Sequence, residues 1–476
     1  MARLLRLLTF AVLVCLSCVP SAAEAGTDCP EGLVCTNVSV PLDRTGAVPG
    51  TIDLPVVSEP GNDPLLIFLG GGPGQGMTQY ADYAIPFYSS LMPGYRVAFL
   101  DQRGTGQNAI SCPSIQFAAL TDLTSPPRGS IETCGRKLGD TRGFYSTADT
   151  VADLDAVRQA LGAGKLSLFG VSYGTYVAEM YARAHPEHTG RLVLDSVVPQ
   201  ENVGPFFDNG MRRSAVVFRQ LCRLGVCRGV TQDPVRDLAK LVKRTDRKPI
   251  MGRVRLKKGH PRERVSIDGV VLYDMTISLA SFDPKNFAKF PAAISKALDG
   301  RPARLLRLAL ATKKENATPD VESLSWGAHT ATLCADIKTW PWGGADTPVS
   351  GRYALTVRAA KKIPARRFAP FDRKTATGNG ALVSCQRWQR TEVPPVPDPG
   401  PLPKVPTLIF AGGWDLSTPI PNAREEARRS STEKLVVIPR SGHAQAGYLP
   451  CTYPILRRFF TDRPLGHPCA GHKPDL

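Results

Sequence analysis

Short apolar runs, each ending in glycine or a polar turn, predict strands at both ends of the chain. Residues 65–69 (LLIFL) are continuously apolar, which is typical of a strand covered on both faces. Residues 166–169 form a second such run, which is too short for a helix. The same pattern predicts strands at residues 95–100, 191–194, 407–411 and 435–438, and a two-stranded meander at residues 36–40 and 51–57.

Amphipathic stretches alternate with these runs. Residues 147–161 repeat apolar positions at helical spacing and stop at Gly162, a residue that favours helix termination. Apolar positions between residues 176 and 181 have the same spacing, directly after the run at 166–169. Strands that alternate with helices predict an α/β fold with a mostly parallel central sheet and helices on both faces.

The strand pattern stops between residue 199 and about residue 403, where helical stretches such as 211–224, 238–242 and 294–310 dominate. This part predicts a mainly helical lid inserted between strands of the sheet. The proline-rich run at 394–406 is the expected return to the core, because proline is excluded from central strands. The predicted segments are a signal peptide (1–25), a first part of the core (26–199), the lid (200–403) and a second part of the core (404–476).

The first 25 residues have the pattern of a secretory signal. Arg3 and Arg6 precede an apolar run at 7–19, and small residues follow, with cleavage expected after Ala23 or Ala25. A membrane anchor is less consistent with this pattern because the run is shorter than a bilayer span. We therefore expect a secreted, periplasmic or envelope-associated protein that has no stable membrane insertion after cleavage.

Cysteine usage agrees with export. Of the twelve cysteines, Cys15 and Cys18 leave with the signal, so an even number remains. Zinc binding is disfavoured because no Cys-x-x-Cys follows the signal and the histidines do not cluster near cysteines, so no metal site is predicted. Spacing favours the disulfides Cys29–Cys35, Cys222–Cys227 and Cys451–Cys469, and the remaining cysteines leave Cys112–Cys134 and Cys334–Cys385.

The chain is basic, with a formal net charge of +17 and a pI near 9.5. The richest run, at 243–264, contains no aromatic residue that could stack on a base. We therefore expect no nucleic-acid partner, and a solvated basic face that is loosely attracted to an anionic envelope.

A serine between two glycines follows the run at 166–169. The sequence Gly170-Val171-Ser172-Tyr173-Gly174 joins a predicted strand to a predicted helix, which is the setting of the nucleophile elbow of α/β-hydrolases. The tight turn excludes Cβ atoms at the flanking positions and exposes the serine at the carboxyl edge of the sheet. Ser172 is the predicted nucleophile.

A glycine-rich loop, GGGPGQG at 70–76, follows the strand at 65–69. No Gly-Lys-Ser/Thr follows, so the loop is not a P-loop. Glycines let backbone N–H groups approach a ligand closely, and this loop is the expected half of an oxyanion hole. The predicted donors are the N–H groups of Gly71, Gly72 and Tyr173.

Asp415 and His443 follow the last two predicted strands, on the edge of the sheet where Ser172 lies. The chain order Ser, Asp, His is that of α/β-hydrolases. His443 is the one histidine of seven that follows a core strand in a loop able to reach Ser172. Asp195 also ends a strand, but it precedes the lid and is expected to hold backbone amides there. The predicted triad is Ser172, His443 and Asp415, which needs no metal or organic cofactor.

Three motifs in order, GGGPGQG, DQRGTGQ (101–107) and GVSYGTY (170–176), resemble those of the proline iminopeptidase and tripeptidyl aminopeptidase family of α/β-hydrolases, and the secreted, disulfide-bearing tripeptidyl aminopeptidase branch most of all. The likeness spans about 29–198 and 385–469. Gly70 departs from the family, which usually places His, Pro or another residue there, so the local shape of the oxyanion loop is expected to differ.

The resemblance implies a serine exopeptidase whose partner is a peptide with a free N-terminus, and a lid that excludes longer or blocked chains. The substrate ammonium needs a carboxylate, for which Glu322 and Asp336 in the lid are the candidates, although both also fit surface acids or local caps. A secreted carboxylesterase or lipase with the same triad is the alternative, and a non-catalytic binding protein on this scaffold is a third. The sequence does not indicate an oligomeric state.

Overall fold

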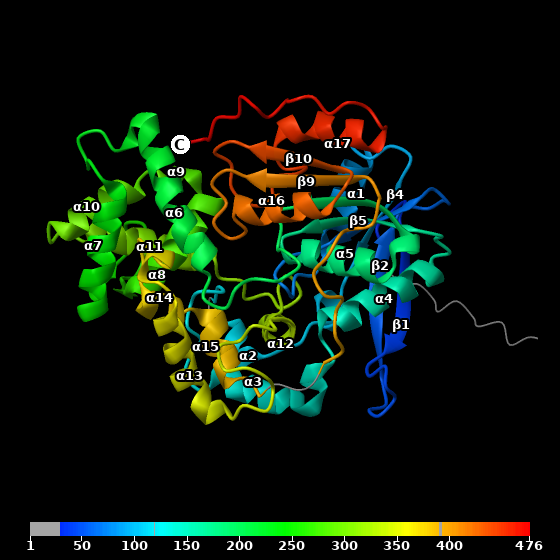
Figure 1. Ribbon diagram of the computed structural model, residues 1–476, viewed down its shortest axis with the longest axis horizontal. Helices are drawn as coiled ribbons and strands as arrows, with labels where there is room; N and C mark the ends of the chain where they lie inside the picture. The colour runs from blue at the N-terminus through cyan, green and yellow to red at the C-terminus, as the bar shows by residue number, and fades with distance from the viewer. Residues whose placement is uncertain (1–28, 119, 390–392) are drawn as a thin grey trace, which may run out of the picture.

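An eight-stranded sheet lies beside a mainly helical region and is seen to its right in Figure 1. The computed structural model describes residues 29–118, 120–389 and 393–476, so the predicted signal peptide, with Cys15 and Cys18, lies outside the described residues. The strand order is β1-β2-β4-β3-β5-β6-β9-β10, in which β1, β2 and β4 pair antiparallel and the remaining neighbours pair parallel. The strands are β1 (Val34–Pro41), β2 (Thr51–Ser58), β3 (Leu65–Leu69), β4 (Arg96–Leu100), β5 (Leu166–Val171), β6 (Thr189–Asp195), β9 (Thr407–Gly412) and β10 (Glu433–Ile438).

Helices cover both faces of this sheet, as the alternating pattern predicts. Side chains alternate along β3: Leu65, Ile67 and Leu69 face one apolar cluster, and Leu66 and Phe68 face the other. The first cluster includes α4 (Thr147–Ala160), α5 (Tyr173–Ala184) and α16 (Ile420–Arg429), and the second includes α1 (Ala81–Ser89) and α17 (Tyr453–Phe460). A strand with both faces buried is continuously apolar, and for this reason the sequence pattern at 65–69 predicts β3.

The region between β6 and β9 is a mainly helical lid with its own apolar cluster, drawn from green to yellow in Figure 1. Two short helices from the first part of the core, α2 (Pro113–Gln116) and α3 (Ser130–Leu138), contribute Ile115 and Ile131 to the same cluster. The lid helices are α6 (Asp208–Leu221), a π-turn (Cys222–Val226), α7 (Pro234–Arg247), α8 (Gly269–Phe282), α9 (Pro284–Phe287), α10 (Phe290–Leu298), α11 (Ala303–Glu315), α12 (Trp326–Asp336), α13 (Val349–Lys362), α14 (Arg373–Thr377) and α15 (Gly380–Arg387).

Two expectations for the lid were wrong. The lid contains an antiparallel hairpin, β7 (Ile250–Val254) and β8 (Glu263–Ile267), inside the basic run where no strand was predicted. Its apolar positions are few, and basic residues surround them, so the alternation is hard to recognise. The stretch 294–310 is not one helix but parts of α10 and α11, which are separated by Gly300 at φ +81° and by Pro302.

The ten cysteines after the predicted signal lie in five pairs at disulfide distance, with Cα atoms 4.9–5.8 Å apart. The pairs are Cys29–Cys35, Cys112–Cys134, Cys222–Cys227, Cys334–Cys385 and Cys451–Cys469.

Within the described residues, no helix is both long enough and apolar enough to cross a bilayer.

Candidate active site

Ser172 lies in a strained turn between β5 and α5. Its backbone has φ 55° and ψ −122°, a conformation that non-glycine residues rarely adopt. A Cβ on Gly170 would lie 2.4 Å from the carbonyl oxygen of Gly174, and one on Gly174 would lie 2.2 Å from that of Leu69. Both positions therefore require glycine, and the turn presents Ser172 at the carboxyl end of β5.

Asp415 and His443 form a buried pair beyond β9 and β10. The Nδ1 atom of His443 lies 2.8 Å from Oδ2 of Asp415. The other carboxylate oxygen accepts the backbone N–H groups of Ser417 at 2.9 Å and Thr418 at 3.0 Å, and the Thr418 hydroxyl donates to Oδ2 at 2.7 Å. The Ser281 hydroxyl also donates to Oδ1 at 3.5 Å. This arrangement fixes the carboxylate with Oδ2 facing the imidazole.

Each member of this pair shifts the pKa of the other in the direction that favours the charged form. Burial alone would raise the pKa of Asp415, but the imidazole charge and hydrogen bond outweigh it and hold the pKa below the ordinary value of 3.8. Burial alone would lower the pKa of His443, yet the Asp415 charge and hydrogen bond raise the pKa above its ordinary 6.5. Because an ionised carboxylate only accepts, Nδ1 of His443 carries a proton and Nε2 is left as the basic atom.

The end of β6 connects the serine turn to the histidine loop. The N–H of Ser172 donates to the carbonyl of Asp195 at 2.9 Å, while the Asp195 carboxylate accepts the N–H of Ala446 at 2.7 Å. Next to it, the Ser196 hydroxyl accepts the N–H of Ala444 at 2.8 Å. Asp195 therefore braces the loop that carries His443, a structural task, and Asp415 is the acid that contacts the imidazole.

Unusual backbone conformations gather at this point. Ser172, Ser196 and Ala444 all have positive φ, of 55°, 62° and 56°. Such strain is retained where the surroundings impose it, and it concentrates at functional sites. Among the described residues, neither Oγ of Ser172 nor Nε2 of His443 has a hydrogen-bond partner. The structure therefore brings Asp415 and His443 into contact but shows no hydrogen bond between His443 and the Ser172 hydroxyl, a bond that often forms only in the substrate complex.

The glycine loop passes directly beside Ser172. A Cβ on Gly71 would lie 3.1 Å from the Cβ of Ser172. The N–H of Gly71, one of the predicted oxyanion donors, donates instead to Oε1 of Gln75 at 3.0 Å. The N–H groups of Gly72 and Tyr173 donate to no other described residue. Two of the three predicted donors are therefore open, and Gln75 occupies the third.

The lid also contacts this loop, and sequence reasoning missed that contact. The Nδ1 atom of His329 lies 2.9 Å from the carbonyl oxygen of Pro73, and its Nε2 lies 2.7 Å from Oδ1 of Asp122. The N–H of Ser325 donates to the carbonyl of Gly74 at 2.9 Å, and a Cβ on Gly74 would lie 2.5 Å from the carbonyl oxygen of Ser325. The start of α12 thus fixes the shape of the oxyanion loop.

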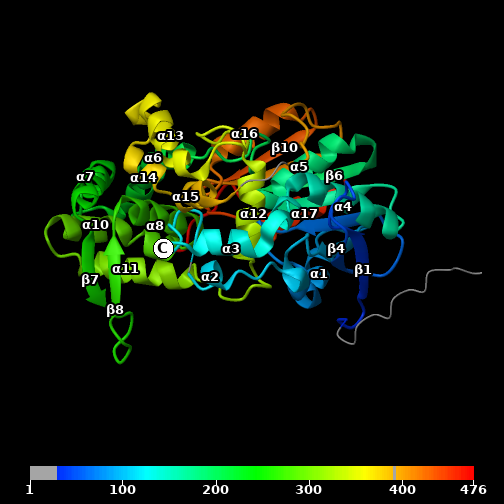
Figure 2. The ribbon, with the colours of Figure 1, turned by 90° about the horizontal axis from the view of Figure 1, so that it is seen from below.

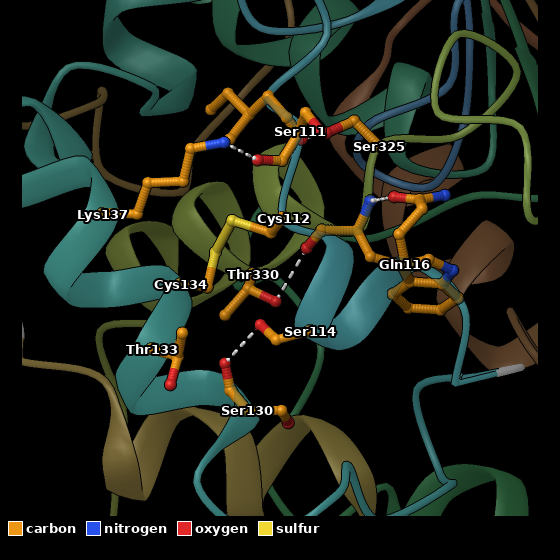
Figure 3. Close-up of a disulfide and its surroundings, with 12 residues drawn as sticks. Ser111, Cys112, Ser114, Gln116, Ser130, Thr133, Cys134, Lys137, Ser325 and Thr330 are labelled. Atoms are coloured by element: carbon orange, nitrogen blue, oxygen red, sulfur yellow. Dashed lines mark hydrogen bonds between the residues drawn. A yellow bond between two sulfur atoms is a disulfide. The ribbon is translucent and has the colours of Figure 1, made fainter.

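A disulfide supports the start of α12 from behind (Figure 3). Cys112–Cys134 joins the segment around α2 to α3, and Figure 3 shows Gln116 beside this bridge. Oε1 of Gln116 accepts the N–H of Trp326 at 3.1 Å, and the Ser325 hydroxyl donates to the carbonyl of Ile110 at 2.7 Å. The glycine loop thus bonds to the start of α12, and α12 bonds in turn to the segment that Cys112–Cys134 bridges.

The end of α8 contacts both the acid and the base, and this was also missed. The carbonyl of Ser281 accepts the N–H of His443 at 2.8 Å, and the Ser281 hydroxyl accepts the N–H of Leu416 at 3.0 Å. The ring of Phe282, which is 60% exposed, lies 5.2 Å from the imidazole of His443. The apolar pattern of α8 indicated only core packing, so nothing in the sequence singled out its last two residues.

The two acids predicted to bind an ammonium lie in different surroundings. Asp336 is buried and accepts the N–H of Thr147 at 2.9 Å and its hydroxyl at 2.6 Å, and Tyr173 donates to it at 3.5 Å. Burial raises the pKa of Asp336 to about 6, against the lowering effect of the Thr147 bonds. Glu322 is exposed, its carboxylate has no partner among the described residues, and its backbone carbonyl lies next to Gly76. No group of three or more potential ligand side chains among the described residues could hold a metal ion.

Two family models match this chain. The α/β hydrolase fold matches residues 64–216, and the TAP-like protein family matches residues 370–468. The chain has the α/β hydrolase fold. Its first match covers the glycine loop and the serine turn, and its TAP-like match covers the loops of Asp415 and His443.

Curated relatives of this chain have peptidase names. A tripeptidyl aminopeptidase of Streptomyces lividans is 31% identical over 211 residues, which is 37% of this chain and 39% of the relative. Serine protease Hip1 of Mycobacterium bovis is 24% identical over 427 residues, 82% of this chain and 78% of the relative. A proline iminopeptidase of Neisseria meningitidis is 32% identical over 141 residues, 29% of this chain and 35% of the relative. The chain thus spans well under half the length of the first and the last of these.

Proposed function

We propose that this protein is a serine peptidase that cleaves short peptides from a free N-terminus. The observation that carries the proposal is the buried Asp415–His443 pair, with 2.8 Å between Nδ1 and Oδ2, in a loop braced by the strand end that also binds the backbone of Ser172. The peptidase names of the relatives support the peptide as substrate.

In the proposed mechanism, Nε2 of His443 takes the hydroxyl proton of Ser172 as Oγ attacks the scissile carbonyl carbon. Asp415 stabilises the imidazolium that forms. The imidazolium then gives its proton to the leaving amine, the C–N bond breaks, and an ester on Ser172 remains. Water, deprotonated by the same Nε2, attacks this ester, and the peptide acid and free Ser172 are released.

The tetrahedral oxyanion needs donors that are already in place. The N–H groups of Tyr173 and Gly72 are the proposed pair, since neither has a partner among the described residues. The N–H of Gly71 joins them only if Gln75 releases it. A single donor of this kind is worth about 2.7–4 kcal/mol in the transition state.

For the substrate ammonium we propose Glu322 rather than Asp336. Asp336 is buried and already accepts bonds from Thr147 and Tyr173, so it positions Tyr173 beside the nucleophile. Glu322 is exposed at the outer side of the glycine loop. An extended tripeptide reaches roughly 10 Å from the scissile bond, so its ammonium partner lies at a distance from Ser172.

Export and the division into core, lid and core belong to the same proposal. The leader-like pattern of residues 1–25 and the five cysteine pairs support an oxidising compartment. The run of helices between β6 and β9 supports a lid at 200–403, with the core at 26–199 and 404–476.

A substrate panel tests the proposal: free and N-acetylated tripeptide anilides, a proline anilide and short acyl esters, each with the wild type and with Ser172→Ala. Cleavage of free-amine peptides alone, absent in the variant, is the expected result. Turnover of esters alone would instead identify a carboxylesterase or lipase. No turnover and no labelling by a fluorophosphonate would identify a binding protein. Loss of tripeptide preference in Glu322→Gln, with Asp320→Asn as control, tests the ammonium partner.

A further inference from the structure

The β7–β8 hairpin projects from the end of the lid, and its connecting loop extends away from the rest of the molecule (Figure 2). One face of the hairpin packs inward: Val254, Val265 and Ile267 are buried. A Cβ on Gly252 would lie 2.6 Å from a methyl group of Leu306 on α11. The inner face thus accounts for the folding of the hairpin, and the outer face is left to solvent.

The outer face is basic and lacks acidic partners. Glu263 is the one acid within the hairpin, and its carboxylate pairs with Lys314 of α11 at 2.8 Å. No cation of the hairpin or its loop forms an ion pair with a described residue. The exposed cations are Arg253, Arg255, Lys257, Lys258, Arg262 and Arg264.

Pairing within the hairpin brings two of these charges together. Arg253 lies directly opposite Arg264 in the antiparallel register. Directly opposite residues have Cβ atoms roughly 5 Å apart, and like charges in such pairs are destabilising. Arg264 reaches across to the sulfur of Met251 at 3.8 Å and not to any carboxylate. An anionic surface outside the molecule would relieve this repulsion, because the protein itself does not.

Two apolar side chains stand among the cations. Met251 is 56% exposed on β7, and Leu256, near the tip, is 39% exposed. The whole stretch 243–264 has no aromatic residue on which a base could stack. Arginines that bind phosphates, together with aliphatic side chains that enter the headgroup boundary, suit a bilayer better than a nucleic acid.

We propose that the outer face of the β7–β8 hairpin docks this protein on an anionic phospholipid bilayer. The occupant is the headgroup phosphate layer, bound by the six cations, with Leu256 at the acyl boundary. The proposal does not depend on the peptidase activity. Since α8 follows the hairpin and is 14 residues long, about 20 Å separates this surface from Ser281 and the triad, so docking leaves the site of chemistry clear of the bilayer.

Vesicle co-sedimentation tests the proposal with the purified protein. We expect binding to phosphatidylcholine vesicles that contain about a third phosphatidylglycerol, no binding to pure phosphatidylcholine, and loss of binding in high salt. The variant R253Q/R255Q/R262Q/R264Q should bind at least about tenfold more weakly. It should also unfold at no lower temperature, because the replaced side chains are exposed and mutually repulsive. Leu256→Gln should weaken binding without changing its dependence on salt.

The matched control is R358Q/K361Q/K362Q/R366Q, which removes four exposed cations from α13 and the turn after it. This control should bind vesicles as the wild type does. Equal binding by the hairpin variant and the wild type would overturn the proposal, as would equal weakening by the control. Tighter binding to a fluorescent DNA duplex than to the anionic vesicles, lost in the hairpin variant, would assign the surface to nucleic acid instead.

Discussion

Asp415 determines how His443 can act. Burial alone would lower the pKa of the imidazole, but the carboxylate, whose Oδ2 lies 2.8 Å from Nδ1, raises this pKa. A base of this kind works only when neutral, so its pKa sets the lower end of the active pH range. The pair therefore ties the pH dependence of the proposed reaction to one hydrogen bond.

Asp415→Asn should change both the size and the pH dependence of activity. We expect kcat to fall by about 10⁴, because an amide favours the wrong tautomer of His443. In the wild type, kcat/KM should rise with pH through a value above the ordinary 6.5 of histidine. Without the carboxylate charge, burial lowers the pKa of His443, so this rise should move to lower pH. An unchanged pH profile would show that Asp415 is not the partner of the base.

His329 should act through the oxyanion loop, since it bonds to Pro73 and does not contact Ser172. In His329→Gln both donors lie on one nitrogen and not on separate ring atoms, so the Pro73 carbonyl and Asp122 cannot be held in their present geometry and the loop should lose its fixed shape. We predict a fall in kcat of about tenfold or more with little change in KM, because the donors act mainly in the transition state. His467→Gln, on the exposed tail, is the control. A change confined to KM would mean that His329 serves ground-state binding.

The sequence indicated Ser172, Asp415 and His443 because each follows a strand end and has glycine or another turn residue beside it. It could not indicate Ser281 or His329, which belong to lid helices with ordinary apolar patterns. Ser281 contacts Leu416 across a sequence separation of 135 residues, and His329 contacts Pro73 across a separation of 256 residues. Nor could the sequence show that the Gln75 side chain accepts the N–H of Gly71, because that bond depends on one side-chain rotamer.

At the scale of elements, the lid contacts the loops of the proposed active site. The end of α8 bonds to the loops of Asp415 and His443, and the start of α12 bonds to the oxyanion loop. The segment of α2 and α3, bridged by Cys112–Cys134, holds α12 in place. A mutation in these elements should therefore alter catalysis even though it lies far from the triad in sequence.

Removal of two different disulfides should separate stability from activity. Cys112→Ser/Cys134→Ser opens a bridge of sequence separation 22 and should cost about 3 kcal/mol of unfolding free energy. Cys222→Ser/Cys227→Ser opens one of separation 5 and should cost about 2 kcal/mol. Of these two variants, only the first should also lower kcat, because Cys112–Cys134, unlike Cys222–Cys227, bridges the segment that bonds to the start of α12. Denaturant unfolding and steady-state kinetics measure both effects; equal loss of kcat in the two variants would contradict this role.

All eight strands of the sheet were predictable: the buried strands are apolar runs with clear ends, and β1 and β2 form the short meander before them. The hairpin of β7 and β8 was not, because half of its residues face solvent and are basic. The break between α10 and α11 depends on Gly300 and Pro302, whose turn the apolar periodicity obscured.

For the molecule as a whole, buried carboxyls make stability depend on pH. Burial raises the pKa of Asp274 to about 6, although hydroxyls of Thr121 and Thr124 lower it in part. Asp195 and Asp336 are raised to about 6 by burial as well. A folded-state pKa above the unfolded one means that the folded chain holds the proton more tightly, so these groups favour folding at low pH.

Asp274→Asn should remove one such contribution. Below about pH 4, Asp274 is protonated in both states, so the variant should be no more stable than the wild type. Between about pH 4 and 6, the wild type loses stability as the folded carboxyl resists ionisation, and the variant should gain up to about 3 kcal/mol relative to it. Urea unfolding across this pH range measures the difference. A difference independent of pH would contradict the prediction.

The long, mainly helical stretch between β6 and β9 could be predicted, because it interrupts the strand pattern, while the bounds of core and lid stay predictions. The participation of residues 110–138 in the lid cluster could not, since apolar side chains do not reveal which cluster they join. The lid contacts to the loops of Pro73, Asp415 and His443 likewise come from a part of the chain for which the sequence predicts only a covering role.

The most direct measurement is the mass of the protein, and of its proteolytic peptides, after reaction with a fluorophosphonate. We predict one label per chain, on the peptide that contains Ser172, and strongly slowed labelling in His443→Ala with unchanged folding by circular dichroism. A label on another residue, or equally fast labelling without His443, would contradict the proposed triad.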